Sequence, residues 1–143
     1  MSIGPVHPIA VVVRSIEEAL PRYAALFGWR PEAAPFTFES QRVRLCFMAT
    51  GEPPAARIEL VQPVDGESGV ARFLAARGEG LHHVCLATDD LPADLAALAA
   101  AEAELIDREP RAGAHGEVAF IHPRTLNGVL WELLSSLEDA RER

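Results

Sequence analysis

The chain has 143 residues, with 13 basic and 21 acidic side chains and a formal net charge of -8. This length suits one compact domain with a substantial apolar core. No basic cluster interleaves with aromatic residues, so we expect no nucleic-acid partner. No apolar run approaches the roughly 18 residues of a membrane span and no leader pattern opens the chain, so we predict a cytoplasmic protein with no membrane partner. Cys46 and Cys85 each lie in an apolar run, which favours reduced core thiols.

The first half of the chain predicts a strand, a helix and three further strands. Residues 8–13 are rich in β-branched side chains and predict the first strand. Ser15 and Glu18 have the spacing of a capping box, and Gly28 is expected to end the helix that they begin. The remaining strands are expected over residues 29–35, 43–48 and 57–62.

The second half repeats this plan after a stretch that contains one short helix with an apolar face. Residues 83–88 predict a strand, and Asp89 and Asp90 can begin the helix that follows it. Three more strands are expected over residues 104–107, 117–121 and 129–134. Each half therefore reads as strand, helix, strand, strand, strand.

The two halves match residue by residue. A shift of 75 positions places Pro8 on His83, and a shift of 73 positions places Glu59 on Glu132. Such self-similarity predicts an α+β fold of two tandem βαβββ modules within a single domain. The expected parts are module one at about 5–63, a linker at about 64–79, module two at about 80–136 and a tail at 137–143.

Two acidic residues at matching positions indicate a functional cavity. Glu59 and Glu132 each lie in an apolar strand, where a buried carboxylate is costly unless a charge, a metal or hydrogen bonds compensate for it. Because side chains alternate along a strand, His83 and Cys85 share one face, and Pro8 lies on the matching face of the first module.

Four segments together resemble the vicinal oxygen chelate superfamily, and within it the methylmalonyl-CoA epimerase family. They are SIEEALPRYAALFGW at 15–29, IELVQP at 58–63, GEGLHHVCLATDDL at 78–91 and AHGEVAFIHPRTLNGVLWELL at 114–134. The resemblance covers nearly the whole chain. It implies sheets curled around a shared cleft that holds a divalent metal, and a dimer is expected because this family often dimerises.

The resemblance also implies a ligand set, with two departures from the family pattern. Glu59, His83 and Glu132 match metal ligands, whereas the histidine of the first strand is replaced by Pro8. His7 is the alternative ligand if the strand begins late or carries a bulge near Pro8. A second carboxylate, which the family usually places on the strand corresponding to 43–48, falls nearest Leu45 here, so the resemblance implies only one of the two catalytic carboxylates.

One imidazole and two carboxylates favour Co²⁺, Mn²⁺, Fe²⁺, Ni²⁺ or Mg²⁺. The predicted function is a metal-dependent epimerase or isomerase of a 2-substituted malonyl-CoA or similar thioester, with Glu132 transferring the α-proton. We expect His122, Arg124 and Cys85 to contact the substrate. Two alternatives stay open: a metal-free relative that only binds a small molecule, and a metal-dependent lyase or isomerase acting on another substrate.

Overall fold

The computed structural model describes residues 3–135, and these fall into two compact units. One unit comprises Pro8–His82, and the other comprises residues 3–7 together with residues 83–135. Strands β1 (Ile3–Val12) and β5 (Gly80–Thr88) each run from one unit into the other. None of the described helices is long and apolar enough to cross a membrane.

The unit at residues 8–82 has the strand order β2-β3-β4-β1, in which β1 is parallel to β4 and the other pairs are antiparallel. Ser15 begins its first helix by accepting a hydrogen bond from the Glu18 amide, and Gly28 ends that helix with a φ of 73°. The predicted capping residues are therefore confirmed. Its further elements are α1 (Ile16–Phe27), β2 (Phe36–Phe38), the 3-10 turn η1 (Glu39–Gln41), β3 (Val43–Ala49), β4 (Arg57–Pro63) and α2 (Gly69–Arg77).

The unit at residues 83–135 has the matching order β5-β8-β7-β6, in which β5 is parallel to β8. Asp90 begins its helix by accepting a hydrogen bond from the Ala93 amide at 3.1 Å. Its further elements are α3 (Leu91–Ala100), β6 (Arg111–Ala112), β7 (Glu117–Ile121), the 3-10 turn η2 (Pro123–Thr125) and β8 (Trp131–Ser135).

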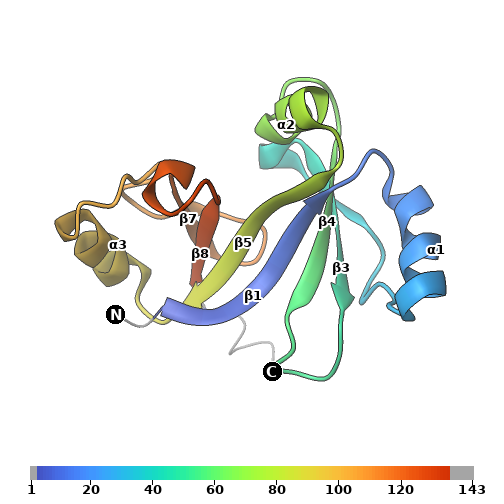
Figure 1. Cartoon of the computed structure of the whole chain (residues 1–143), viewed down its shortest axis with the longest axis horizontal. Helices are drawn as coiled ribbons and strands as arrows, with labels where there is room; N and C mark the ends of the chain where they lie inside the picture. The colour runs from blue at the N-terminus through green and yellow to red at the C-terminus, as the bar shows by residue number, and fades with distance from the viewer. Residues whose placement is uncertain (1–2, 136–143) are drawn as a thin grey trace. The chain divides into compact units, whose positions relative to one another are not determined.

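Helices α1 and α3 each lie against one face of the sheet of their own unit (Figure 1). Beneath α1 lies a buried cluster that extends across β3 and β4: Val13, Ile16, Cys46, Met48 and Leu60. Beneath α3 lies the corresponding cluster: Leu91, Leu95, Ala119, Ile121 and Leu133. Because the apolar side chains that face the helices fill the cores, the opposite face of each sheet carries the polar residues of interest.

The sequence repeat is reproduced in the strand register. Ala10 pairs with Glu59, and Glu59 pairs with Phe47 on its other side. The counterparts in the second unit are Cys85, Glu132 and Phe120, which pair in the same order. This agreement confirms the α+β fold of two βαβββ modules.

Two predicted strands are wrong. Residues 29–35 contribute only a bridge between Pro31 and Met48, and the strand that pairs with β3 is β2, because Pro31 and Pro35 lack the N–H that a strand ladder needs. Residues 104–107 contribute only a bridge between Leu105 and Ile121. There the Asp107 carboxylate accepts the Phe120 amide at 2.8 Å and replaces a ladder bond.

Candidate functional site

The face of the second unit's sheet that carries Glu132 is called here the Glu132 face. Glu132 of β8 lies between Cys85 of β5 and Phe120 of β7 in the strand register. His83 precedes Cys85 by two residues, so its side chain projects from the same face. The sheet thus gathers residues that are far apart in the sequence.

His83 and Glu132 form a close polar pair on this face. Nε2 of His83 lies 2.7 Å from Oε2 of Glu132, and the side chains are 8% and 15% exposed. The ring of Phe120 meets the His83 ring edge-on, with centroids 5.6 Å apart and planes at 89°. The aromatic ring limits the movement of the imidazole and keeps water from it, which strengthens the electrostatic coupling of the pair.

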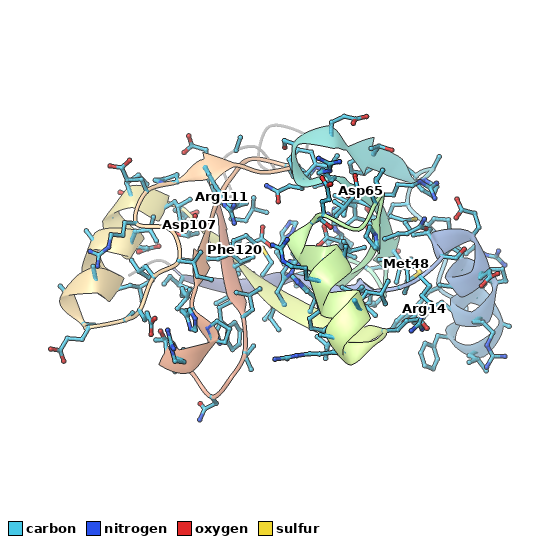
Figure 2. The ribbon with its side chains drawn as sticks, turned by 90° about the horizontal axis from the view of Figure 1, so that it is seen from above. Arg14, Met48, Asp65, Asp107, Arg111 and Phe120 are labelled. Atoms are coloured by element: carbon cyan, nitrogen blue, oxygen red, sulfur yellow. The ribbon has the colours of Figure 1, made fainter. Side chains whose placement is uncertain are left out.

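The ring of Phe120 also contacts Arg111, an arginine that the sequence analysis did not single out. The guanidinium carbon of Arg111 lies 5.1 Å from the Phe120 ring centroid, and its Nε lies 3.3 Å from Oδ2 of Asp107. Figure 2 shows these three side chains together in one part of the second unit. Arg111 therefore adds a positive charge to the surroundings of the ring that packs against His83.

The matching face of the first unit's sheet is called here the Glu59 face. Glu59 is 8% exposed and lies between Ala10 and Phe47 in the register. Pro8 is buried in the interior of β1, two residues before Ala10, which is the position that His83 has relative to Cys85. Leu45, only 4% exposed, lies on this face two residues before Phe47. Strand β3 carries no acidic residue.

His7 precedes Pro8 in β1, so alternation turns it toward the opposite face from Pro8. The strand begins at Ile3 rather than near Pro8, and the late strand start that would turn His7 back is not seen. The role of His7 as a ligand stays a prediction.

The Glu59 face also carries Arg57, which the sequence analysis missed. Arg57 lies two residues before Glu59 in β4, and its guanidinium carbon is 4.4 Å from the Phe47 ring centroid. Its side chain is 26% exposed and makes a contact of 3.4 Å with Glu32. The spacing of Arg57 from Glu59 was a signal in the sequence, because residues i and i+2 of a strand share a face.

The residues expected to contact substrate lie in different settings. Cys85 is 1% exposed and packs in a buried cluster with Val118 and Leu134. His122 begins the η2 turn, and its Nδ1 accepts a hydrogen bond from the Arg124 amide at 3.0 Å. The Arg124 side chain is 72% exposed and engages Glu104 through two N–H groups, which holds the pKa of Glu104 below its usual value. The substrate role of all three stays a prediction.

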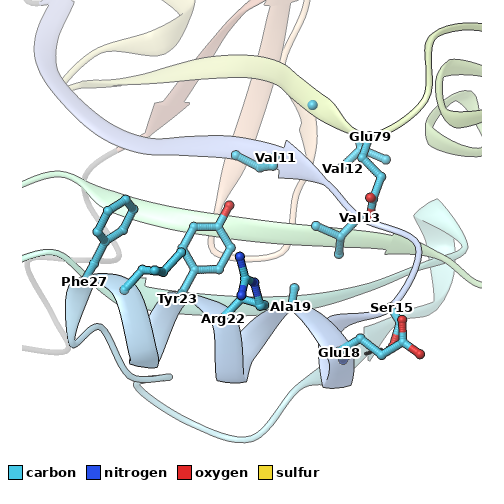
Figure 3. Close-up of a pocket in the computed structure, with 12 residues that line it drawn as sticks. Val11, Val12, Val13, Ser15, Glu18, Ala19, Arg22, Tyr23, Phe27 and Glu79 are labelled. Atoms are coloured by element: carbon cyan, nitrogen blue, oxygen red, sulfur yellow. Dashed lines mark hydrogen bonds between the residues drawn. The ribbon is translucent and has the colours of Figure 1, made fainter.

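A separate cavity of about 550 Å³ lies on the α1 side of the first unit. Figure 3 shows Tyr23, Arg22 and Phe27 of α1 around it, with Val11 of β1 and Glu79 nearby. Val11 packs with the core beneath α1, so this cavity belongs to the helix side of β1. It holds none of the residues that the sequence singled out for chemistry.

The donor atoms of the Glu132 face fit a divalent metal as part of a larger set. Adjacent ligands of a six-coordinate ion with bonds of about 2.1 Å lie about 3 Å apart. The 2.7 Å between Nε2 of His83 and Oε2 of Glu132 is close to this separation. Within the described residues of either unit, no three His, Cys, Asp or Glu side chains gather as a metal-binding group. A metal held by this pair would therefore need further ligands, and the participation of Glu59 stays a prediction.

Comparison with known proteins identifies the family. The model of the Glyoxalase/Bleomycin resistance protein/Dioxygenase superfamily matches residues 7–120, and the chain belongs to this superfamily. It is 39% identical over 126 residues to the uncharacterized protein YqjC of Bacillus subtilis, with 87% of each chain covered.

Further similarities indicate the class of protein within this superfamily. The chain is 34% identical over 134 residues to an ethylmalonyl-CoA/methylmalonyl-CoA epimerase of Cereibacter sphaeroides, covering 92% of this chain and 97% of the relative. A methylmalonyl-CoA epimerase variant of Streptomyces coelicolor, solved in complex with 2-nitronate-propionyl-CoA, superimposes with a TM-score of 0.84 at 29% identity, covering 95% and 96% of the two chains. The chain is thus an epimerase-like enzyme of the isomerase class, and the resemblance in the sequence is confirmed.

Proposed function

We propose that this protein is a metal-dependent epimerase of a 2-substituted malonyl-CoA or a similar acyl thioester. Relatives that match over most of their length are named methylmalonyl-CoA epimerases. The observation that carries the proposal for this chain is the His83–Glu132 pair, with its 2.7 Å separation on a largely buried face.

The chemistry follows from the substrate class. A carbon between a thioester carbonyl and a carboxylate has an acidic proton, and its removal and return on the opposite side interconvert the two epimers. Glu132 is the carboxylate that we assign to this proton transfer, because it is largely shielded from water and lies beside an imidazole. His83 lies directly against the carboxylate, and Phe120 packs edge-on against the imidazole.

We assign the metal to His83, Glu132 and Glu59, with His7 as the candidate additional ligand. One imidazole nitrogen with carboxylate oxygens suits Co²⁺, Mn²⁺, Fe²⁺, Ni²⁺ or Mg²⁺. A bound ion of this kind supplies Lewis-acid stabilisation of the negative charge that develops when the proton leaves. The metal dependence of the activity is part of the proposal.

A second candidate function is the binding of a small molecule without turnover. Leu45 and Pro8 favour it, because each places an apolar residue on the Glu59 face where the resemblance implies a polar one. Without a second carboxylate on β3, Glu132 would have to serve both sides of the substrate carbon, or another group would have to deliver the proton. Calorimetry of an acyl-CoA with metal-free protein tests this candidate.

The experiment that tests the proposed function starts from one epimer of methylmalonyl-CoA. Protein loaded with Co²⁺ should convert it into an equilibrium mixture of the two epimers, which is measured by chromatography of the intact thioesters because these are diastereomers. Glu132→Gln should lower kcat by about a hundredfold or more. The matched control is Glu117→Gln, an exposed residue in β7 of the same sheet, which should turn over at the wild-type rate. Binding of the substrate with no interconversion would reject the epimerase and favour the binding function.

A further inference from the structure

Arg57 lies on the functional face of the first unit, next to residues that have counterparts in the second. It pairs in the register with Pro8 on one side and with Ala49 on the other, two positions before Glu59. Pro8 has no polar side chain, so the Arg57 guanidinium adds a positive charge at this corner of the Glu59 face. The second unit has Leu130 at the matching shift of 73 positions, so this charge is not part of the repeat.

An aromatic platform holds the guanidinium in place. Its carbon lies 4.4 Å from the Phe47 ring centroid, and Phe47 in turn stacks with Phe36 at a centroid distance of 6.3 Å. Stacking on an aromatic face fixes the plane of a guanidinium and leaves its N–H groups directed outward along its edge. The side chain is thereby preorganised for a planar acceptor.

The N–H groups of Arg57 are not saturated by the described part of the protein. Its Nε is buried and has no hydrogen-bond partner among the described residues. One terminal nitrogen reaches Glu32, at the long distance of 3.4 Å. A buried N–H without an acceptor is unfavourable, and the two-pronged edge of a guanidinium matches a carboxylate. Apart from the contact with Glu32, the N–H groups of Arg57 are therefore candidates for hydrogen bonds with an anion.

We propose that Arg57 binds the free carboxylate of the substrate and sets the preference for malonyl-type thioesters over simple acyl thioesters. This inference rests on the proposed function and deepens it, because it names the group that the site recognises. The positive charge of Arg57 lies on the same face of the sheet as the side chain of Glu59. Phosphate groups of coenzyme A are the other anions of such a substrate, and the test separates them from the carboxylate.

The test compares methylmalonyl-CoA with isobutyryl-CoA, in which a methyl group replaces the carboxylate. Calorimetry should show that wild-type protein binds methylmalonyl-CoA more tightly. Arg57→Gln should weaken the binding of methylmalonyl-CoA about tenfold or more and change the affinity for isobutyryl-CoA by no more than about twofold. Arg57→Lys keeps the positive charge but not the planar guanidinium, so its affinity for methylmalonyl-CoA should lie between those of the wild type and Arg57→Gln. This variant keeps the test informative if Arg57→Gln misfolds. Arg30→Gln removes an exposed arginine of the same unit and should change neither affinity.

The outcomes separate the two claims. Wild-type protein that binds neither thioester rejects the proposed function itself. Wild-type protein that binds methylmalonyl-CoA, with Arg57→Gln binding it equally well, rejects the role of Arg57 alone. If Arg57→Gln loses affinity for both thioesters equally, Arg57 binds the phosphate groups of coenzyme A, and the carboxylate assignment is overturned.

Discussion

Pro8 occupies in β1 the position that His83 occupies in β5. Each lies two residues before the residue that faces the glutamate of its own module, Ala10 in the first and Cys85 in the second. The strand register therefore supports what the sequence repeat indicated: the first module carries a proline where the second carries an imidazole. The proposed metal set therefore has one fewer imidazole than the repeat would allow.

Restoring that imidazole should strengthen metal binding. Pro8→His places a nitrogen donor on the Glu59 face, and we expect the affinity for Co²⁺ to rise about tenfold or more in calorimetry. His7→Ala, one residue away and on the opposite face, is the companion variant. Lower Co²⁺ affinity in His7→Ala would support the ligand role proposed for His7, and unchanged affinity would reject it.

Removing His83 should lower bound metal and turnover together. The imidazole is 2.7 Å from the Glu132 carboxylate, so its loss removes a proposed ligand beside the proposed base. Elemental analysis of His83→Ala after loading with Co²⁺ measures the first effect, and the epimer assay measures the second.

The adjacent His82 provides the control for that experiment. It projects from the other face of β5, where its ring packs edge-on against Phe73 at a centroid distance of 5.0 Å. His82→Ala should lose packing and some thermal stability but keep the metal content of the wild type. Unchanged metal content in His83→Ala would contradict the ligand assignment.

Much of the fold was predictable because the relevant signals are local. Ser15, Glu18 and Gly28 mark the ends of α1 through hydrogen bonds within a few residues of each end. Glu59 and Glu132 stand out because each interrupts an apolar strand, and their equivalence follows from one shift of the sequence. Such patterns depend little on the rest of the chain.

The parts that could not be predicted depend on pairing across strands. Residues 29–35 have an apolar pattern, but the two prolines in this stretch prevent it from forming a ladder, and β2 forms after it. The positions of Arg57 over Phe47 and of Arg111 over Phe120 are set by which residues lie opposite in the sheet. Arg111 lies in β6, which has only two residues, and so short a strand gives no sequence pattern from which its pairing with β7 could be predicted.

The ion pair of Arg124 and Glu104 should make a pH-dependent contribution to stability. The pKa of Glu104 is lowered from 4.5, chiefly by its hydrogen bonds with Arg124. A lowered pKa means that the pair stabilises the fold above the ordinary value and that this stabilisation is lost as the pH falls through the lowered value. The difference in Tm between wild type and Glu104→Gln should therefore be present at about pH 7 and should decrease as the pH falls below the ordinary range of a glutamate. A difference that stays the same as the pH falls would contradict this account.

The same variant tests whether Arg124 contacts substrate. Glu104→Gln releases the guanidinium, and at low salt the KM for a CoA thioester should fall about twofold because screening is weak. The decrease should be absent when Arg124→Gln is added. No change in KM at low salt would count against the predicted role of Arg124.

Gly113 should be essential for the turn between β6 and β7. A Cβ at this position would lie 2.6 Å from Cγ1 of Val118 and 2.8 Å from the Gly116 carbonyl oxygen. Val118 packs with Cys85 on the Glu132 face, so it cannot yield without disturbing that face. Gly113→Ala should lower the free energy of unfolding by about 1–3 kcal/mol.

Gly66 is the matched control for that substitution, because a Cβ there meets no atom within 4 Å. Gly66→Ala should change the free energy of unfolding by less than about 1 kcal/mol in urea titrations. Equal effects of the two substitutions would refute the steric explanation.

The most direct test of the proposed function is exchange of the substrate α-proton with solvent. Methylmalonyl-CoA in D₂O, with Co²⁺-loaded protein, is followed by proton NMR of the α-proton signal. We predict that wild-type protein removes this signal far faster than the protein-free solution and that Glu132→Gln does not. Tight binding of methylmalonyl-CoA with no exchange above the protein-free rate would contradict the epimerase and leave a protein that only holds its ligand.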